Sequence, residues 1–232
     1  ALPARDTATP DDRAALDATT PPCPADMALV GASCVDRYEA PNVERGLPLV
    51  MYTFPEAEAW CAARGKRLCF DDEWASACEG PSRWAYPYGD AHRPGVCNDE
   101  ELWRVYNQTL LNGWPSGASS PTIATLDALW DAARPRASAT VDHLRALYQA
   151  EPAGSNVGCT NASGVFDTLG NVEEWTRRRD GGTRDFHGML KGRYWGNERP
   201  MRDTRCRGGV TTHGDGFRFY EIGFRCCRDR AP

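Results

Sequence analysis

The sequence lacks several patterns that would assign it to a broad class. No stretch of about 18 consecutive apolar residues is present, so no segment is expected to span a membrane. There is no long run of Lys and Arg, and the formal net charge is −5, which argues against a nucleic-acid partner. Patterns typical of serine hydrolases, zinc proteases and nucleotide-binding loops are also absent. The common catalytic classes are therefore not indicated.

The chain also lacks any Cys-x-x-Cys pair, although it contains 10 cysteines. Zinc ribbons and thioredoxin-like redox sites need such close pairs. An even number of widely spaced cysteines instead indicates disulfides made in an oxidising compartment. The chain begins at Ala1 without a hydrophobic signal segment. We therefore expect a mature exported protein that is secreted, periplasmic or on the cell surface.

The composition is that of a globular protein with much irregular structure, and the length of 232 residues allows one large domain or two small ones. Hydrophobic residues make up 41% of the chain, which is enough for a core, and 22 Gly with 17 Pro predict many loops and turns. Residues 1–22 are rich in Ala, Asp, Thr and Pro, and they predict a flexible N-terminal arm. The domain is expected over residues 23–232. The abundance of Ala and Arg beside only two Lys is typical of a GC-rich bacterial genome.

Short regular elements are expected near the start of the domain. Met27–Val30 and Cys34–Tyr38 are predicted as strands. Thr53 and Glu56 have the spacing of a capping box and predict the start of a helix. A second helix is expected from Asp71, because acidic residues favour the positive end of the helix dipole.

Residues at about 100–150 differ in character from the rest and predict an inserted unit of two or three amphipathic helices. The simpler interpretation is that the apolar faces of this insert cover the core of the domain. The alternative is that the insert binds a partner or, with the N-terminal arm, supports self-assembly. The apolar residues at helical spacing are Leu102, Val105, Tyr106, Ile123, Leu126, Leu129, Trp130, Ala133, Val141, Leu144, Leu147 and Tyr148.

An acidic turn over residues 167–175 suggests calcium chemistry. Asp167 and Glu174 can supply carboxylate oxygens, and Gly170 permits a tight turn. The backbone carbonyls of Gly170 and Val172 can complete a cage of oxygen donors. Calcium prefers such oxygen ligands in a flexible, negatively charged setting.

Four segments together resemble the formylglycine-generating enzyme, or sulfatase-modifying-factor, family. They are Glu58–Asp90 (Glu-Ala-Trp-Cys through to Tyr-Pro-Tyr-Gly-Asp), Gly164–Trp175 (Gly-Val-Phe-Asp-Thr-Leu-Gly-Asn-Val-Glu-Glu-Trp), Leu190–Gly192 (Leu-Lys-Gly) and Gly223–Cys226 (Gly-Phe-Arg-Cys). The resemblance extends from about residue 25 to residue 228 and is broken by the insert. It implies a disulfide-stabilised α+β domain with a helical insert. The fold of such a domain is an irregular, loop-rich variant of the C-type lectin fold that commonly binds structural calcium.

The resemblance also assigns roles to individual residues. It places Asp167, Gly170, Val172 and Glu174 on the family's calcium-binding loop. Residues 98 and 99 fall where a second calcium site begins in some members, which adds Asn98 and Asp99 as candidate ligands. Two disulfides are implied, Cys61–Cys226 and Cys78–Cys206. The pairing of the other six cysteines stays open, and the pairs expected are Cys23–Cys34, whose members are close in the chain, Cys97–Cys159 and Cys69–Cys227.

The chain departs from catalytic members of the family at one place. Those members hold copper(I) with two cysteines that lie between the Lys-Gly motif and the residue matching Cys206, because soft thiolates suit that metal. Here the segment 191–205 contains no cysteine, and the equivalent positions are near Gly196 and Met201. We therefore expect no copper and no formylglycine-generating oxidase activity.

The leading hypothesis is a non-catalytic member that binds a protein, a peptide or a glycan through the former active-site groove. Tyr, Trp and Arg dominate binding hot spots, and all three residue types are present in this segment. The expected groove residues are Arg193, Tyr194, Trp195, Asn197, Glu198, Arg199, Arg202 and His187. The alternative for Trp195 is that its ring packs in the core of the domain.

Two other functions stay open at this point. One is an oxidative enzyme that holds a different redox metal with His187, His213, Asp185 or Asp215. The other is a structural subunit of an extracellular assembly, with the N-terminal arm and the insert as contacts.

Overall fold

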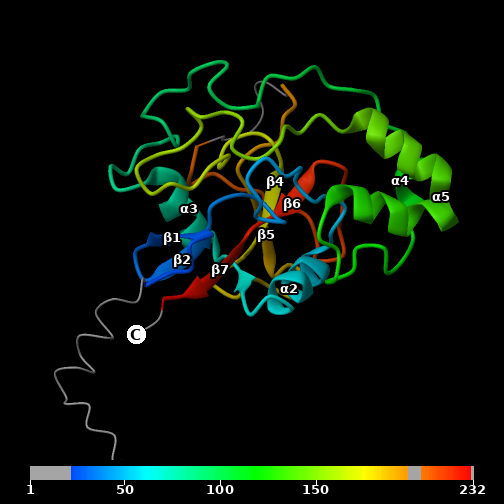
Figure 1. Cartoon of the computed structure of the whole chain (residues 1–232), viewed down its shortest axis with the longest axis horizontal. Coiled ribbons are helices and arrows are strands. Elements are labelled where there is room, and N and C mark those ends of the chain that lie inside the picture. Colours follow the sequence, from blue (N-terminus) through cyan, green and yellow to red (C-terminus); the bar gives the residue numbers. More distant parts are fainter. Residues whose placement is uncertain (1–21, 198–204, 231–232) are drawn as a thin grey trace, which may run out of the picture.

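Two small sheets lie at the centre of the molecule and the helices pack around them, as Figure 1 shows. The structure is a computed structural model that describes residues 22–197 and 205–230. The predicted N-terminal arm therefore lies outside the described residues, except for its last residue. The strands are β1 (Met27–Val30), β2 (Ser33–Asp36), β3 (Arg67–Leu68), β4 (Glu173–Arg177), β5 (Gly188–Lys191), β6 (Ile222–Phe224) and β7 (Cys226–Asp229). The helices are α2 (Phe54–Ala62), α3 (Asp71–Glu79), α4 (Gln108–Asn112) and α5 (Leu126–Leu147).

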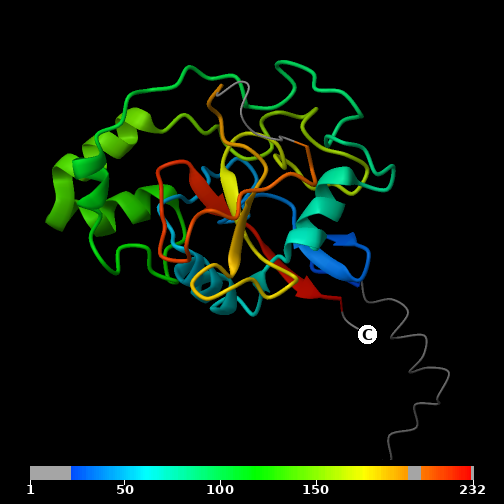
Figure 2. The same cartoon turned by 180° about the vertical axis from the view of Figure 1, so that it is seen from behind.

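The two sheets are joined by the C-terminal part of the chain. The first has the order β1-β2-β7-β3 and is antiparallel, and the second has the order β5-β4-β6. In the second sheet β4 is antiparallel to β5 and parallel to β6. Since only Arg225 separates β6 from β7, the chain passes directly from one sheet into the other. Figure 2 shows the red β7 arrow ending near the blue β1–β2 hairpin.

The early elements form where the sequence predicts them. Strand β1 has the predicted bounds, and β2 covers most of the second predicted strand. The Thr53 backbone N–H donates to Glu56 Oε2 at 2.9 Å, and the Thr53 hydroxyl accepts from the Glu56 N–H. This capping box starts α2, and α3 begins at Asp71 as expected.

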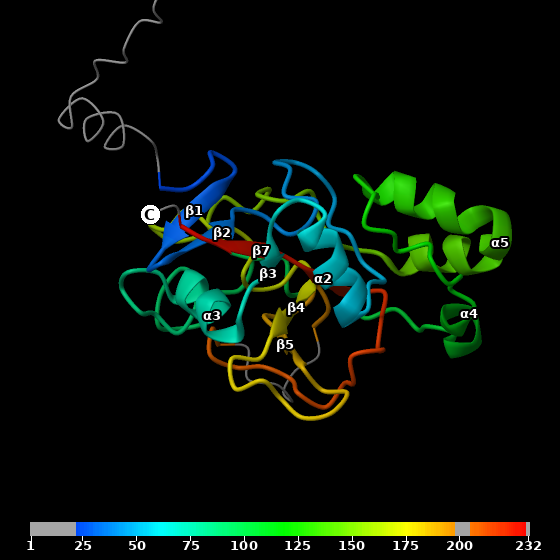
Figure 3. The same ribbon diagram turned by 90° about the horizontal axis from the view of Figure 1, so that it is seen from below.

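The helical insert covers the domain's own core, as the simpler interpretation predicted. The buried face of α5 belongs to the same hydrophobic cluster as the central strands. Its members on α5 are Leu126, Leu129, Trp130, Ala133, Val141, Leu144 and Leu147. Figures 1 and 3 place α4 and α5 together at one end of the molecule.

The prediction of a helix at the start of the insert is wrong. Residues 102–106 form no helix, and Leu102 and Val105 are 82% and 78% exposed. Glu101, which directly precedes this segment, pairs with another part of the chain, since its N–H donates to the Trp195 carbonyl at 2.8 Å. Arg104 Nη1 donates to the carbonyl of Ala146 at 2.6 Å. The segment is therefore an extended strap rather than a helix.

All 10 cysteines are paired, and no free thiol is left. Both disulfides implied by the resemblance and the three further expected pairs are confirmed. Four of the five join cysteines that are 62 to 165 positions apart in the chain. Each such bridge contributes about 2–4 kcal/mol by restricting the unfolded chain. The pairs are Cys23–Cys34, Cys61–Cys226, Cys69–Cys227, Cys78–Cys206 and Cys97–Cys159.

The disulfides fit an oxidising compartment. In the described part of the chain, no helix combines the length and the apolar character that crossing a bilayer needs.

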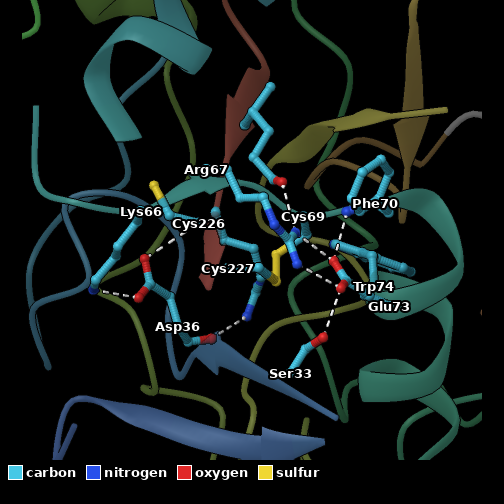
Figure 4. Close-up of a disulfide and its surroundings, with 12 residues drawn as sticks. Ser33, Asp36, Lys66, Arg67, Cys69, Phe70, Glu73, Trp74, Cys226 and Cys227 are labelled. Atoms are coloured by element: carbon cyan, nitrogen blue, oxygen red, sulfur yellow. Dashed lines mark hydrogen bonds and ion pairs between the residues drawn. A yellow bond between two sulfur atoms is a disulfide. The ribbon is translucent and has the colours of Figure 1, made fainter. Parts of the chain in front are cut away.

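A polar network surrounds the Cys69–Cys227 disulfide, as Figure 4 shows. Arg67 pairs with both carboxylate oxygens of Glu73 at 2.7 and 2.8 Å, and Ser33 Oγ donates to Glu73 at 2.6 Å. These contacts tie β2, β3 and α3 together around the buried disulfide.

A buried ion pair between Lys66 and Asp36 lies in the same part of the first sheet. Lys66 Nζ lies 2.6 Å from Asp36 Oδ1, and the Cys226 N–H donates to Asp36 Oδ2 at 3.2 Å. Burial raises the pKa of Asp36 to about 6, because its effect outweighs the nearby Lys66 ammonium, which lowers the pKa. Figure 4 shows both contacts of Asp36.

Asp36 should make the stability depend on pH in a defined direction. Its pKa is about 6 when folded and 3.8 ordinarily, so the folded state holds this proton more tightly. The resulting stability is fully present below about pH 4 and is lost as the pH rises through about 6. The Asp36→Asn variant lacks this titration. Its deficit in unfolding free energy relative to wild type should be larger at pH 4 than at pH 7, by about 2 kcal/mol. Urea unfolding at both pH values measures the deficit, and an equal deficit would contradict the assignment.

Candidate functional site

A fully buried ion pair organises the predicted calcium loop. Arg225 Nε donates to Glu174 Oε2 at 2.7 Å, and Arg225 Nη2 donates to Glu174 Oε1 at 2.6 Å. Arg225 Nη2 also donates to the carbonyl of Phe166 at 3.0 Å, and the Trp74 indole N–H donates to Glu174 Oε2 at 2.9 Å. The side chains of Arg225 and Glu174 are 0% and 1% exposed. The C-terminal chain is thereby tied to the loop and to α3.

Two more buried carboxyl groups, Glu39 and Asp167, share this guanidinium. Burial raises the pKa of Glu39 well above its ordinary value, and the charge of Asp167 adds to the rise while Arg225 opposes it. Burial also raises the pKa of Asp167 to about 6. The carboxyl groups of Glu174, Glu39 and Asp167 therefore share the single positive charge of Arg225. Such a region favours the uptake of further positive charge, either as protons or as a cation.

The loop itself turns tightly at Gly170, as its sequence predicted. Gly170 and Asn171 have φ angles of 76° and 58°. A Cβ at Gly170 would lie 2.2 Å from the carbonyl oxygen of Asn98, so only glycine fits there. The Asn171 N–H donates to that same Asn98 oxygen at 2.7 Å. The loop is thus packed directly against the segment that begins at residue 98.

The donors of this loop fit an oxygen-bound cation in type and in charge. Glu39 Oε2 is buried and has no hydrogen-bond partner among the described residues. Glu174 accepts three hydrogen bonds, but its two oxygens offer about four lone-pair sites. In the part of the chain that is described, no three His, Cys, Asp or Glu side chains form a group that could hold a metal. A calcium ion here would therefore need the carbonyls of Gly170 and Val172 as well as the carboxylates.

The residues expected at a second calcium site have structural contacts. Asn98 Nδ2 donates to the carbonyl of Gln149 and to Asn171 Oδ1, both at 3.1 Å. Asp99 Oδ2 lies 2.7 Å from His92 Nε2. Asn98 therefore braces the loop while Asp99 contacts His92. Among the described residues, no group of three His, Cys, Asp or Glu side chains that could hold a metal forms around them.

Two of the expected groove residues are buried in the core. Tyr194 and Trp195 are 3% and 1% exposed. The Trp195 ring packs against Tyr148 and Tyr220, with ring centroids 5.3 and 6.0 Å apart. The expectation that both rings line a ligand groove is therefore wrong. They fill the space between the insert and the C-terminal segment, which is the core alternative for Trp195.

The other expected groove residues that the structure describes differ in burial and in contacts. Arg193 is half-buried, and its Nη2 donates to the Gly196 carbonyl at 2.9 Å. Asn197 is exposed. His187 lies apart from them, with its Nδ1 2.6 Å from Asp215 Oδ2. Three expected residues lie outside the described part of the chain, namely Glu198, Arg199 and Arg202.

A pocket of about 380 Å³ lies beside the buried Trp195, next to Tyr220. One wall comes from the extended strap of the insert and the other from the segment before β6. Its lining combines five aromatic side chains with two carboxylates and no Lys or Arg among the described residues. The lining residues are Trp103, Tyr106, Gln108, Glu173, His213, Phe217, Phe219, Tyr220, Glu221 and Ile222.

The rings of this pocket contact one another. Tyr106 packs edge-on against Phe219 at 5.0 Å, and Trp103 packs edge-on against Tyr106 at 6.0 Å. His213 stacks on Phe217 at 3.9 Å. Trp103 and Tyr106 remain 45% and 36% exposed, so the pocket is open to solvent at the strap.

Sequence reasoning missed most of this pocket and also missed Glu39. The Phe-Arg-Phe-Tyr-Glu run at residues 217–221 was the available signal, because three aromatic residues in five are unusual in a turn-rich segment. Its partner Tyr106 lies more than a hundred positions earlier and was expected on a helix. Only the tertiary fold brings the two together.

The residues of the alternative redox site do not assemble into a metal site. His187 and Asp215 form a close pair, and the Asp215 N–H donates to the carbonyl of Asp185 at 2.8 Å. His213 instead stacks in the aromatic pocket. Within residues 22–197 and 205–230 these side chains form no group of three that could hold a metal.

The structure also excludes a thiolate pair for copper, since every cysteine of the chain is in a disulfide. Gly196, near which the sequence predicted the equivalent of one copper ligand, lies against Tyr194. A Cβ there would come within 2.4 Å of the Tyr194 ring. Met201, the other position, lies outside the described residues.

Two curated relatives resemble most of this chain. The inactive C-alpha-formylglycine-generating enzyme 2 of Mus musculus is 25% identical over 190 residues, which cover 78% of this chain and 48% of the relative. The protein of the same name from Bos taurus is 24% identical over 187 residues, which cover 77% of this chain and 49% of the relative. The chain thus spans about half the length of these relatives.

Two solved structures are similar at lower identity. PvdO from Pseudomonas aeruginosa is 18% identical with a TM-score of 0.46, covering 94% of this chain and 75% of PvdO. CarF is 15% identical with a TM-score of 0.49, covering 85% of this chain and 86% of CarF. Both TM-scores are below 0.5, and we draw no functional conclusion from either.

The comparison with family models also covers most of the chain. The model of the sulfatase-modifying factor enzyme 1-like domain matches residues 31–230, which is most of the chain. The match includes the predicted calcium loop, the Lys-Gly motif, and the Gly-Phe-Arg-Cys segment that contains Arg225. This chain therefore belongs to the sulfatase-modifying factor enzyme 1-like family.

Proposed function

We propose that this chain is an exported, non-catalytic member of its family that acts by binding a protein, a peptide or a glycan. The observation that carries the proposal is that all cysteines are in disulfides, so no thiolate pair is available for copper(I). The names of the curated relatives in Mus musculus and Bos taurus, which describe them as inactive, agree with it.

The aromatic pocket is the surface that supports a binding role. Monomeric proteins seldom leave several large apolar side chains exposed side by side without a partner. Here Leu102, Trp103 and Val105 are exposed along the strap, and Trp103 continues into the pocket. Aromatic anchors in a pocket are typical of the residues that dominate binding energy. The pocket is also next to the segment where catalytic members hold copper, since Tyr220 packs on Trp195.

Array binding tests this role. Wild-type protein should bind at least one peptide or glycan on an array, and Tyr106→Ala/Phe219→Ala should weaken that binding by about thirtyfold, since removing hot-spot rings costs about 2 kcal/mol or more. Val157→Ala is the matched control, because Val157 is 79% exposed and outside the pocket. Circular dichroism checks that each variant folds. Unchanged binding by a folded double variant, or copper-dependent oxidation of a sulfatase-type cysteine peptide, would contradict the proposal.

We also propose that the loop binds one structural calcium ion. Asp167, Glu174 and the carbonyls of Gly170 and Val172 would hold it, with Glu39 nearby. The support is the excess of buried carboxyl groups over positive charge and the unpartnered oxygen of Glu39 within the described residues. An ion with two positive charges would offset that excess.

Thermal unfolding with and without calcium tests the site. Calcium at a hundred times its Kd should raise the free energy of unfolding by about 2.7 kcal/mol, because it binds only the folded state. Asp167→Asn should reduce this gain, whereas Asp185→Asn, an exposed acidic control, should keep it. The absence of any calcium effect on the melting temperature after treatment with a chelator would argue against the site.

A further inference from the structure

A second pocket, of about 660 Å³, lies beside the C-terminal end of α3. Its walls come from the β1–β2 hairpin, the end of α3 with the turn that follows, the loop at residues 162–163, and Arg207. Figures 1 and 3 place α3 and this hairpin at the end of the molecule away from α4 and α5. The second pocket shares no lining residue with the aromatic pocket, so the two are separate sites.

A disulfide and two hydrogen bonds fix the walls of this pocket. The Cys78–Cys206 disulfide joins α3 to the segment that carries Arg207. Asn161 Nδ2 donates to the carbonyls of Ala77 and Cys78 at 2.9 and 2.8 Å, which holds the loop that follows Asn161 against the end of α3. Walls that are held in place lose little freedom when a ligand binds, and this favours affinity.

Two arginines line the pocket, and they differ in their contacts. Arg207 Nε and Nη2 lie 2.6 and 2.8 Å from the two carboxylate oxygens of Glu79. This pair uses two of the five N–H donors of Arg207 and offsets the charge of Glu79. Arg83 is exposed at the pocket, and within residues 22–197 and 205–230 it forms no ion pair. Two arginines and one glutamate leave one positive charge in excess in the described lining.

The backbone conformation of Arg83 is unusual for an arginine. Its φ of 55° lies in the left-handed region, which glycine adopts freely and which costs free energy in a residue with a Cβ. The Arg83 N–H donates to the carbonyl of Gly80 at 3.1 Å and closes the turn after α3. Backbone strain of this kind is found most often at functional sites. An arginine at a position where glycine would fit with less strain therefore favours a role for its charge.

The end of α3 does not cancel this positive charge. A helix C-terminus carries a partial negative charge on carbonyl groups that lack partners, and such a charge would oppose an anion. In α3 the carbonyls of residues 76–79 all accept hydrogen bonds, two from backbone N–H groups at 3.1 Å and two from the Asn161 amide. The partial charge at this end is thereby reduced, and the full charge of the arginine outweighs it.

Apolar side chains lie beside the arginines in the same pocket. Leu29 on the hairpin is 42% exposed, and Pro81 and Ala162 are exposed on two other walls. A volume of about 660 Å³ is within the range of small-molecule pockets and exceeds what a bare ion needs. The pocket therefore fits a group that joins one negative charge to an apolar body.

We propose that this pocket binds a carboxylate attached to an apolar body. Arg83 pairs with the carboxylate, because a guanidinium matches the planar carboxylate with two parallel N–H bonds, while Leu29 and Pro81 contact the apolar part. One excess positive charge suits a singly charged carboxylate better than a doubly charged phosphate. The carboxylate can belong to a small organic acid or to an acidic side chain of a peptide, and the experiment separates these two sources. The site goes beyond the proposed binding role, which concerns the aromatic pocket.

Proton–nitrogen NMR titration of the full chain measures the affinity and locates the site at once. The probes are 4-methylpentanoate, its neutral isostere 4-methylpentanamide, N-acetyl-glutamate methylamide and inorganic phosphate. At least one of the two carboxylates should bind about tenfold more tightly than the amide, and the signals that shift should belong to the lining of this pocket. Tighter binding of the glutamate compound would assign the pocket to a peptide side chain, and tighter binding of the pentanoate to an organic acid.

Substitution by glycine separates the charge of Arg83 from its place in the fold. Arg83→Gly removes the guanidinium and accepts the φ of 55°, so it should melt at about the wild-type temperature or above and bind the carboxylate about tenfold more weakly. Arg45→Gly is the matched control, because Arg45 is also exposed, has a φ of 64° and lies outside the pocket. It removes the same charge and should bind as wild type does.

Four results would overturn the proposal. One is equal binding of the two carboxylates and the neutral amide, and another is the lack of binding by both carboxylates. The third is tighter binding of phosphate than of either carboxylate. The fourth is unchanged affinity in a folded Arg83→Gly variant, or an equal loss of affinity in Arg45→Gly.

Discussion

The buried ion pair between Arg225 and Glu174 is the interaction on which the rest of this structure depends. Its two partners come from the link between β6 and β7 and from β4, so it joins both sheets. The residues that follow Arg225 are Cys226 and Cys227, whose disulfides reach Cys61 of α2 and Cys69 beyond β3. Covalent and ionic links are thus concentrated at one point of the chain. Removing one partner of a buried pair typically costs about 3–5 kcal/mol, because the other charge stays buried.

All cysteines of the chain stabilise the fold as disulfides, so none is left as a reactive thiol. In a loop-rich domain with short strands, five disulfides replace stabilisation that long regular elements would supply. Family membership covers the scaffold, the loop and the C-terminal motif. The chemistry of catalytic members needs two further cysteines, and the segment 191–205 supplies none. Because one fold can host several functions, membership of the family does not by itself assign this chemistry to the chain.

The sequence predicted what depends on local pattern or on family motifs. The capping box at Thr53, the turn at Gly170 and three of the disulfides, Cys23–Cys34, Cys61–Cys226 and Cys78–Cys206, are of this kind. It failed where the outcome depends on contacts between distant segments. Residues 102–106 have helical spacing, yet the backbone of Glu101 just before them pairs with residue 195 and the helix does not form. Glu39 reaches Asn171 across 132 positions, and no local signal marks it as part of the loop.

Metal analysis of protein purified without added metal tests the central claim most directly, which is that this chain keeps the family scaffold without its copper chemistry. The account predicts about one calcium ion per chain, because a single oxygen-lined loop carries the excess of buried carboxyl groups. It predicts no stoichiometric copper(I), since no thiol is free to bind a soft metal. It also predicts no stoichiometric iron, since no three His, Cys, Asp or Glu side chains of the described residues form a group that could hold a metal. Copper or iron at about one ion per chain would contradict it, because such an ion needs a binding site that these residues do not supply.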